Sequence, residues 1–140
     1  MPQIFISHSA AETHELGMQF GAQLLSNSVV CFLGDLGAGK TTFIKGLAAG
    51  VLGIQAEEVN SPTFTYLNIY HGNKTLYHFD LYRLRDADEF LSMGFDEVFD
   101  AGGICCIEWS EKIETLIPDG AIIVKMSHLG EDQRKMEIFS

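Results

Sequence analysis

Residues 34–42 place the strictest limit on what this chain can fold into. They read Gly-Asp-Leu-Gly-Ala-Gly-Lys-Thr-Thr and contain the pattern G-x-x-x-x-G-K-[ST] of a phosphate-binding loop. An apolar run at residues 29–33 precedes the loop, and apolar residues at helical spacing follow it from Phe43 to Val51. The segment therefore predicts a strand, a tight loop and a helix, which is the structural context that such a loop needs.

The residue types in this loop suit the binding of a phosphate chain. Gly34, Gly37 and Gly39, with the small Ala38 between them, leave backbone N–H groups uncovered, and the start of the helix adds favourable dipoles. Lys40 supplies a positive charge for the terminal phosphates. The next residue, a threonine, offers a hydroxyl to Mg²⁺. A glycine-rich turn without a ligand is the alternative, and the apolar flanks on both sides weigh against it.

The composition favours one α/β domain spanning residues 1–140. Apolar residues make up 46% of the 140, enough to form a buried core. No apolar run approaches the length of a membrane span, and the N-terminus lacks the pattern of a signal peptide, so we expect a cytoplasmic protein without membrane contact. Cys31, Cys105 and Cys106 lie in apolar runs and are expected in the core, the last two on opposite faces of a strand.

The formal net charge of −10 limits the possible partners. Only nine lysines and arginines oppose nineteen acidic residues, and nucleic-acid affinity depends on neutralising phosphates, so strong direct binding of RNA or DNA is not expected. Six of the acids fall between Asp86 and Asp100. They form either a docking face for a basic partner or the solvated face of a helix.

The first third of the chain predicts a strand followed by a helix. Residues 4–6 are a short apolar run, and Ser9 with Glu12 has the spacing of a capping box at a helix start. Apolar residues then recur every four positions, with Gly17 and Gly21 beside them. We expect this face of the helix to approach a sheet closely.

Beyond residue 60, the sequence predicts two hairpins and one buried strand, with one or two short helices after the first hairpin. A hairpin with its turn at residues 71–74 is expected between runs at 64–70 and 75–79, and one or two short helices broken near Gly94 are expected next. The run at 104–107 is typical of a buried parallel strand. A last hairpin joins residues 121–126 to 136–139. The fold class is therefore α/β: a three-layer domain like the P-loop NTPases, with a mixed, mostly parallel sheet, helices on both faces, and the ligand at the carboxyl ends of the strands.

A phosphate-loop enzyme generally needs a further carboxylate at the end of a neighbouring strand. Glu108 follows the buried run and is the expected partner of the metal. Asp80 follows a run of mixed character and is expected to orient either the attacking water or a metal-bound water. His78 either orients Asp80 or is a packed core histidine. Arg83 either neutralises charge on the γ-phosphate, faces a partner, or pairs with the acids that follow it.

In order along the chain, these motifs resemble the TsaE (YjeE) family, the small bacterial ATPase of tRNA threonylcarbamoyladenosine biosynthesis. The resemblance rests on the helix start at residues 9–13 with Leu16-Gly17, the loop at 34–42, and Ser61-Pro62-Thr63-Phe64, and then on the segment 78–83 and Ile107-Glu108-Trp109. It implies ATP binding and slow hydrolysis to ADP in support of a complex that modifies adenosine 37 of tRNA. Subunits of the TsaD and TsaB type are the implied partners, and tRNA is met only through them.

Carried over by position, the resemblance implies a set of site residues. The nucleotide phosphates would contact Gly37, Ala38, Gly39, Lys40, Thr41 and Thr42. Mg²⁺ would be held by Thr41 and Glu108, with Asp80 supporting hydrolysis. Trp109 would lie beside the nucleotide, and the base would meet Thr13 and the region from Gly130 to Arg134.

Two rival enzyme classes share the loop but fit the rest of the chain less well. Small-molecule kinases commonly close an arginine-bearing lid, whereas this chain has only Arg83, Arg85 and Arg134. Guanine-nucleotide switches read the base with Asn-Lys-x-Asp, and here Asn73-Lys74 is followed by Thr-Leu. A binding module in which nucleotide gates association without significant hydrolysis stays open as an alternative.

Overall fold

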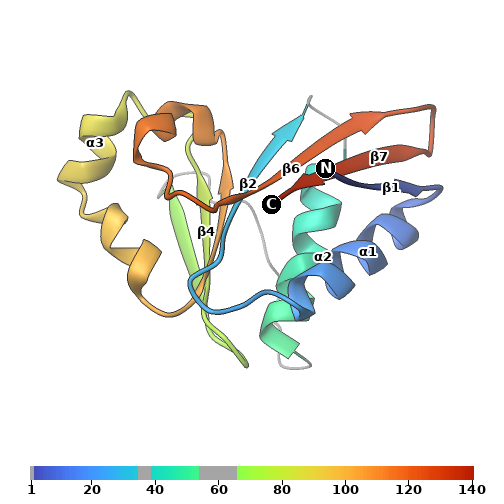
Figure 1. Ribbon diagram of the computed structural model, residues 1–140, viewed down its shortest axis with the longest axis horizontal. Coiled ribbons are helices and arrows are strands. Elements are labelled where there is room, and N and C mark those ends of the chain that lie inside the picture. Colours follow the sequence, from blue (N-terminus) through green and yellow to red (C-terminus); the bar gives the residue numbers. More distant parts are fainter. Residues whose placement is uncertain (1, 35–38, 54–65) are drawn as a thin grey trace.

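The computed structural model describes residues 2–34, 39–53 and 66–140, and its seven strands form a single sheet (Figure 1). The strand order is β1-β7-β6-β2-β5-β4-β3. The strands are β1 Gln3–Ser7, β2 Val29–Gly34, β3 Leu67–Tyr70, β4 Leu76–Asp80, β5 Ile104–Glu108, β6 Ile122–His128 and β7 Arg134–Phe139. The helices are α1 Ala10–Ala22, α2 Lys40–Leu52, α3 Ala87–Ser92, η2 Phe95–Asp100 and η3 Ser110–Leu116.

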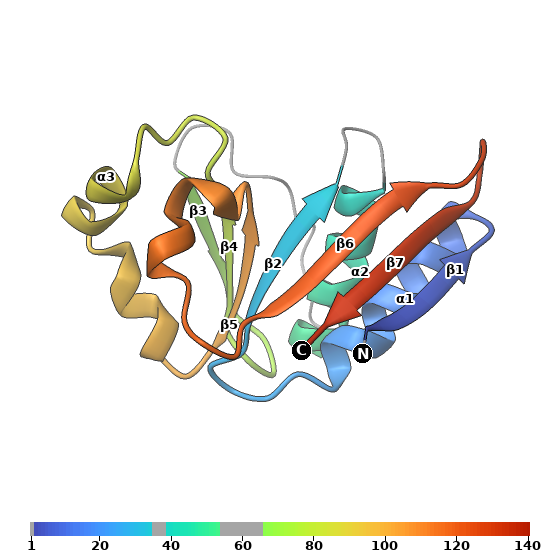
Figure 2. The same ribbon diagram turned by 45° about the horizontal axis from the view of Figure 1, so that its top comes forward.

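The centre of the sheet is parallel and its borders are antiparallel. Strands β4, β5, β2 and β6 pair in parallel with their neighbours, while β3 and β7 run against them. β1 pairs antiparallel to β7, so it runs in the same direction as the central strands and lies at the edge (Figure 2). The prediction of a mixed, mostly parallel sheet is confirmed, as are both hairpins.

Helices cover both faces of the sheet, as the fold class predicted (Figure 1). Successive residues of β2 point to opposite faces, so Phe32 packs with α2 on one side and Cys31 packs on the other. A second hydrophobic core lies on the Cys31 side of the sheet. The helices α3, η2 and η3 contribute Phe90, Phe99 and Ile113 to it. The central strand β5 is buried along its whole length, which explains its continuous apolar run.

The two longest helices touch backbone to backbone through glycines. A Cβ atom at Gly17 or Gly21 of α1 would overlap main-chain atoms of α2, and one at Gly46 or Gly50 of α2 would overlap carbonyl oxygens of α1. The expected approach of this face to the sheet is seen for Leu16 and Phe20, which pack on the core that includes strand residues, but the glycines meet α2 instead. They accommodate the neighbouring helix, because only residues without side chains permit so short an interhelical distance.

The acidic segment folds as two short helices, as predicted. Gly94 separates α3 from η2 with a left-handed conformation (φ 73°). Asp86 caps α3 by accepting a hydrogen bond from the Glu89 N–H at 2.9 Å, so part of the acidic run stabilises helix ends. The helix η3 was not predicted; its backbone is kinked at Ile113, and such a distorted turn shows no regular helical period.

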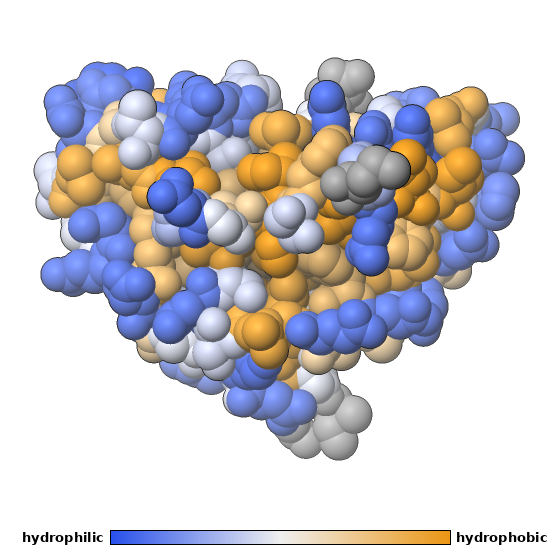
Figure 3. Space-filling model, in the orientation of Figure 1, coloured by the Kyte–Doolittle hydropathy of each residue, from blue (hydrophilic) through white to orange (hydrophobic). Residues whose placement is uncertain are grey.

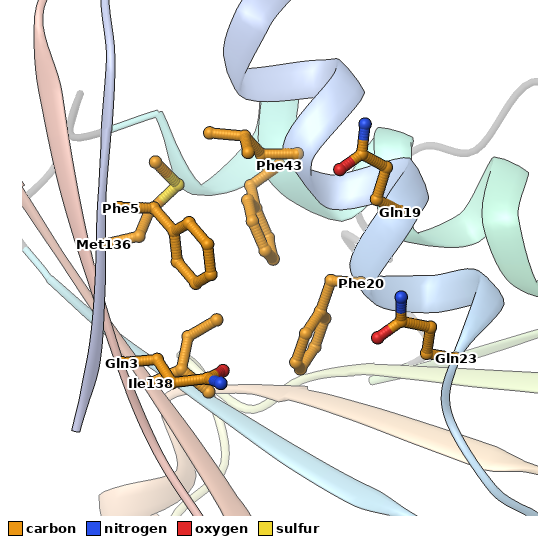
Figure 4. A pocket seen from close by; sticks show the side chains of 9 residues that line it. Gln3, Phe5, Gln19, Phe20, Gln23, Phe43, Met136 and Ile138 are labelled. Carbon is orange, nitrogen blue, oxygen red and sulfur yellow. The ribbon is translucent and has the colours of Figure 1, made fainter. Parts of the chain in front are cut away.

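A pocket of about 210 Å³ lies between α1 and the strands β1, at the edge of the sheet, and β7 beside it (Figure 4). The rings of Phe5, Phe20 and Phe43 face it, with Met136 and Ile138 on the sheet side. The carboxamide side chains of Gln3, Gln19 and Gln23 also line the pocket. The pocket is next to the Gln3 end of β1, away from Ser7, so it is separate from the site described below.

Two further expectations concern burial and membrane contact. Cys31, Cys105 and Cys106 are all buried free thiols, and the last two belong to different cores, as predicted for strand neighbours. Burial raises the pKa of the Cys105 thiol to about 12. Within the described residues, every helix is too short or too polar to span a bilayer.

Candidate functional site

Three strand ends meet at one edge of the sheet and define the candidate site. Glu108, the last residue of β5, is paired in register with Phe32 of β2 on one side and with Asp80 of β4 on the other. β2 ends two residues later at Gly34, where the phosphate-loop sequence begins. Because these strands are parallel, their carboxyl ends bring both predicted carboxylates to the loop.

Lys40 begins α2 and turns back towards the end of β2. Its Nζ donates a hydrogen bond to the Gly34 carbonyl oxygen at 2.9 Å and lies 5.6 Å from the centroid of the Trp109 ring. The preceding residue, Gly39, has a left-handed conformation (φ 91°) and provides no side-chain cap. Among the residues that the structure describes, no side chain caps the first N–H groups of α2, and such groups at a helix start can bind an anion.

Glu108 is held by a buried histidine. Its Oε2 lies 2.9 Å from His78 Nε2, and the two residues are only 6% and 2% exposed. The other ring nitrogen, Nδ1, is buried and has no hydrogen-bond partner among the residues that the structure describes. Of the two roles expected for His78, burial in the core is confirmed. The expected contact with Asp80 is corrected, because the hydrogen bond goes to Glu108.

Asp80 lies in a half-buried position beside these groups. Burial raises the pKa of its carboxyl, and the neighbouring Glu108 raises it further. A hydrogen bond from the Tyr82 N–H to Oδ1 at 3.1 Å acts in the opposite direction, as do His78 and Lys40. The carboxyl is therefore a better proton acceptor than an exposed aspartate, which suits a group that orients or activates water.

The donor atoms at this edge fit Mg²⁺. Thr41 is exposed in the first turn of α2, and Glu108 uses one carboxylate oxygen for His78, which leaves Oε1 for a further partner. Hydroxyl and carboxylate oxygens are the ligands that Mg²⁺ prefers, often with only one or two carboxylates from the protein. Among the described residues, no group of three or more His, Cys, Asp or Glu side chains is arranged to hold a metal ion.

Trp109 and Arg134 border the site from two other elements. Trp109 has a left-handed backbone (φ 62°), is 38% exposed, and packs against Tyr82 with ring centroids 5.0 Å apart. Arg134 begins β7, and its side chain lies 3.5 Å from where a Cβ of Gly39 would stand. Its Nη1 donates to the carbonyl oxygens of Glu131 and Gln133. Both residues thus lie next to the start of α2.

Thr13 has a different environment from the other predicted site residues. Its hydroxyl is 2.5 Å from that of Ser7 and 3.1 Å from the Ser9 carbonyl oxygen, and the residue is 1% exposed. These contacts tie the end of β1 to the first turn of α1. The role beside the base stays a prediction.

The remaining predicted residues are placed as follows. Thr42 is half-buried in α2, and Arg83 is exposed, with no carboxylate at ion-pair distance among the described residues. Gly37 and Ala38, together with the Ser61-Pro62-Thr63-Phe64 motif, lie outside the described residues.

Comparisons with known proteins agree with this geometry. A family model described as "Threonylcarbamoyl adenosine biosynthesis protein TsaE" matches residues 7–136. A Treponema pallidum protein named tRNA threonylcarbamoyladenosine biosynthesis protein TsaE is 43% identical over 133 residues, covering 95% of this chain and 97% of that one. A Bacillus subtilis protein of the same name is 41% identical over 126 residues, covering 89% and 77%. The crystal structure of Bacillus subtilis YdiB superposes with a TM-score of 0.80 and 32% identity, over 99% of this chain and 84% of that one. The family model covers most of the chain, and the curated relatives are 41–43% identical over most of its length, so the chain belongs to the TsaE family.

Proposed function

We propose that this protein is a Mg²⁺-dependent ATPase subunit with slow intrinsic hydrolysis. It supports the complex that makes N6-threonylcarbamoyladenosine at position 37 of tRNA. The observation that carries the proposal is the register of β2, β5 and β4, which brings the loop, Glu108 and Asp80 to one edge in a chain of the TsaE family. Lys40 stands at the same edge.

Each residue has a role that its surroundings support. The Lys40 ammonium binds the terminal phosphates, and N–H groups at the start of α2 hold the others. Thr41 and Glu108 hold Mg²⁺, which when bound neutralises charge on the phosphates. His78 fixes the orientation of the Glu108 carboxylate. Asp80, whose carboxyl has a raised pKa, positions the attacking water.

The partners follow from the family and from the charge of the chain. Subunits of the TsaD and TsaB type carry out the transfer, and this chain joins them in the cytoplasm. A net charge of −10 is unfavourable for contact with tRNA, so the other subunits provide most of the affinity for tRNA. Hydrolysis is expected to be slow for the chain alone and to change when these subunits are added.

The metal and nucleotide assignments are tested through the single tryptophan. Trp109 lies beside Lys40, so ATP binding should change its fluorescence. Thr41→Ala and Glu108→Ala should weaken Mg²⁺-dependent ATP binding at least tenfold, because each removes an oxygen ligand. Thr115→Ala and Glu97→Ala are matched controls at exposed positions on η3 and η2. Unchanged affinity and Mg²⁺ dependence in both site variants would refute the metal assignment, and a preference for GTP would refute the adenine assignment.

The reaction itself is tested by product analysis. Release of inorganic phosphate and ADP identifies an ATPase, whereas transfer of phosphate to a metabolite would identify a kinase. Asp80→Ala should reduce turnover more than it reduces ATP binding, and the opposite result would move Asp80 to the metal. Reconstitution of the tRNA modification with and without this chain then decides whether the ATPase supports that pathway.

A further inference from the structure

A groove of about 480 Å³ lies on the opposite face of the sheet from α1 and α2, between η3 and the strands β2 and β6. Its floor is apolar and comprises Cys31, Leu33, Ile117 and Ile123. In Figure 2, η3 (orange, residues 110–116) stands beside these strands, while the open part of the sheet continues through β7 to β1. Figure 3 shows hydrophobic residues gathered along the middle of the molecule and bordered by hydrophilic ones.

Two carboxylates stand on the η3 side of this groove. Glu111 and Glu114 are exposed and line it, three residues apart on either side of the kink at Ile113. Within the described parts of the chain, no cation lies at ion-pair distance from either. The nearest lysine in sequence, Lys112, instead donates from Nζ to the Leu84 carbonyl oxygen at 3.1 Å. The groove therefore combines an uncovered apolar floor with two negative charges that are not neutralised locally.

We propose that this groove is a docking site for a protein segment that inserts an apolar side chain between η3 and β6 and places lysine or arginine beside Glu111 and Glu114. The apolar floor supplies burial, and the two carboxylates supply charge complementarity, which selects and orients a basic partner. The partner is a subunit of the transfer complex, so the inference rests on the proposed function. Small molecules fit less well, because the groove is open and only its rim is polar.

The groove shares two chain segments with the nucleotide site. Leu33 is followed directly by Gly34, whose carbonyl oxygen accepts the Lys40 hydrogen bond. Ser110, which lines the groove at the start of η3, comes two residues after Glu108. A partner seated in the groove thus contacts the ends of the same strands that hold the loop and the metal carboxylate. Docking is therefore expected to depend on whether ATP or ADP is bound.

The test measures affinity between the full chain and the purified TsaD and TsaB type subunits by calorimetry, with Mg²⁺ and ATP present. Glu111→Lys/Glu114→Lys should weaken binding at least tenfold and reduce its dependence on salt. Asp96→Lys/Glu97→Lys is the matched control, because it makes the same change in net charge at exposed positions on η2. Ile123→Ala tests the floor and should also weaken binding. Each variant is first titrated with ATP through Trp109 fluorescence.

The outcomes separate the docking proposal from the proposed function. Loss of binding in the groove variants alone, with normal ATP titration, supports the groove. Loss in the η2 control with full binding by the groove variants overturns it and places the interface on the acidic helices. If the wild-type chain binds ATP but none of these subunits, the docking proposal is overturned while the ATPase assignment stands. If ATP itself does not bind, the proposed function fails directly.

Discussion

A buried carboxylate such as that of Glu108 needs a partner, and His78 supplies it. The two side chains come from neighbouring parallel strands and meet 2.9 Å apart with almost no exposure to solvent. Their contact links stability to function, because the same carboxylate is the proposed ligand of Mg²⁺. A charged group left buried without a partner costs much more than the pair contributes.

His78→Leu should destabilise the protein by about 1–3 kcal/mol, because it leaves the buried Glu108 carboxylate without its hydrogen bond. Urea unfolding measures the change. His78→Leu/Glu108→Leu is the control, since it removes both polar partners, and it should be less destabilised than the sum of the two single variants. Additive losses would show that the two groups do not stabilise each other.

Asp80 should make stability depend on pH in a defined direction. Burial and Glu108 raise its pKa in the folded protein, so the folded state binds this proton more tightly than the unfolded state does. The resulting stabilisation is complete below about pH 4 and is lost as the pH rises through the folded-state pKa. At pH 7 the ionised carboxylate therefore opposes folding.

Asp80→Asn should raise the melting temperature at pH 7, and the gain should disappear at about pH 3, where the wild-type carboxyl is mostly protonated in both states. Differential scanning calorimetry at the two pH values measures this. Asp132→Asn removes the same charge from an exposed position and controls for the change in net charge. An equal gain at both pH values would contradict the raised pKa.

At this scale the sequence located the candidate residues better than it predicted their contacts. Lys40 and Thr41 belong to a motif with fixed spacing, whereas Asp80 and Glu108 are acids that follow strand-like runs. The structure brings all four to one edge of the sheet, and their roles stay predictions. The bond between His78 and Glu108 was missed. It depends on β4 and β5 being parallel neighbours in a particular register, and no pattern within either strand specifies that register.

At the scale of elements, the contact between α1 and α2 helps to position the start of α2. Gly17 and Gly21 face α2, while Gly46 and Gly50 face α1, so both helices contribute glycines to one seam. The helical stripe of α1 was predicted from its spacing, but its partner was not. An apolar face with glycines fits a sheet or a helix equally well, and only the tertiary structure decides between them.

Gly46→Ala should destabilise the protein by about 1–3 kcal/mol, because the new methyl group would overlap the His14 carbonyl oxygen and force the helices apart. Thermal unfolding measures the change. Gly130→Ala is the matched control, since a Cβ there meets nothing within 4 Å, and it should stay within about 0.5 kcal/mol of wild type. Equal effects at both positions would rule out a steric role for the helix seam.

At the scale of the whole molecule, charge governs the encounter with tRNA. Nineteen acidic residues against nine lysines and arginines should prevent stable binding of tRNA by this chain alone at physiological salt. Gel retardation with the chain, with the transfer subunits, and with both together measures this. Retardation should require the transfer subunits. Retardation of tRNA by this chain alone would contradict the proposal that the transfer subunits provide most of the affinity for tRNA.

The overall architecture was predictable to the extent that local patterns determine it. The buried run of β5 and the loop between β2 and α2 identified the α/β class and the ligand edge. Strand order was not predictable, because the position of β1 beside β7 joins residues from opposite ends of the chain. No local signal encodes a pairing of such long range.

This pairing also has a consequence for folding. β1 is the first strand of the chain, yet its partner β7 is the last, so their pairing brings together opposite ends of the chain and is expected to form slowly. It contains no charged residue, and even in the finished fold Ile4 and Ile6 remain about half exposed. An uncharged, apolar strand with a free edge is prone to pair with other chains during this interval. Aggregation during refolding should therefore begin at the N-terminal strand, at the border of the sheet and three strands away from β2.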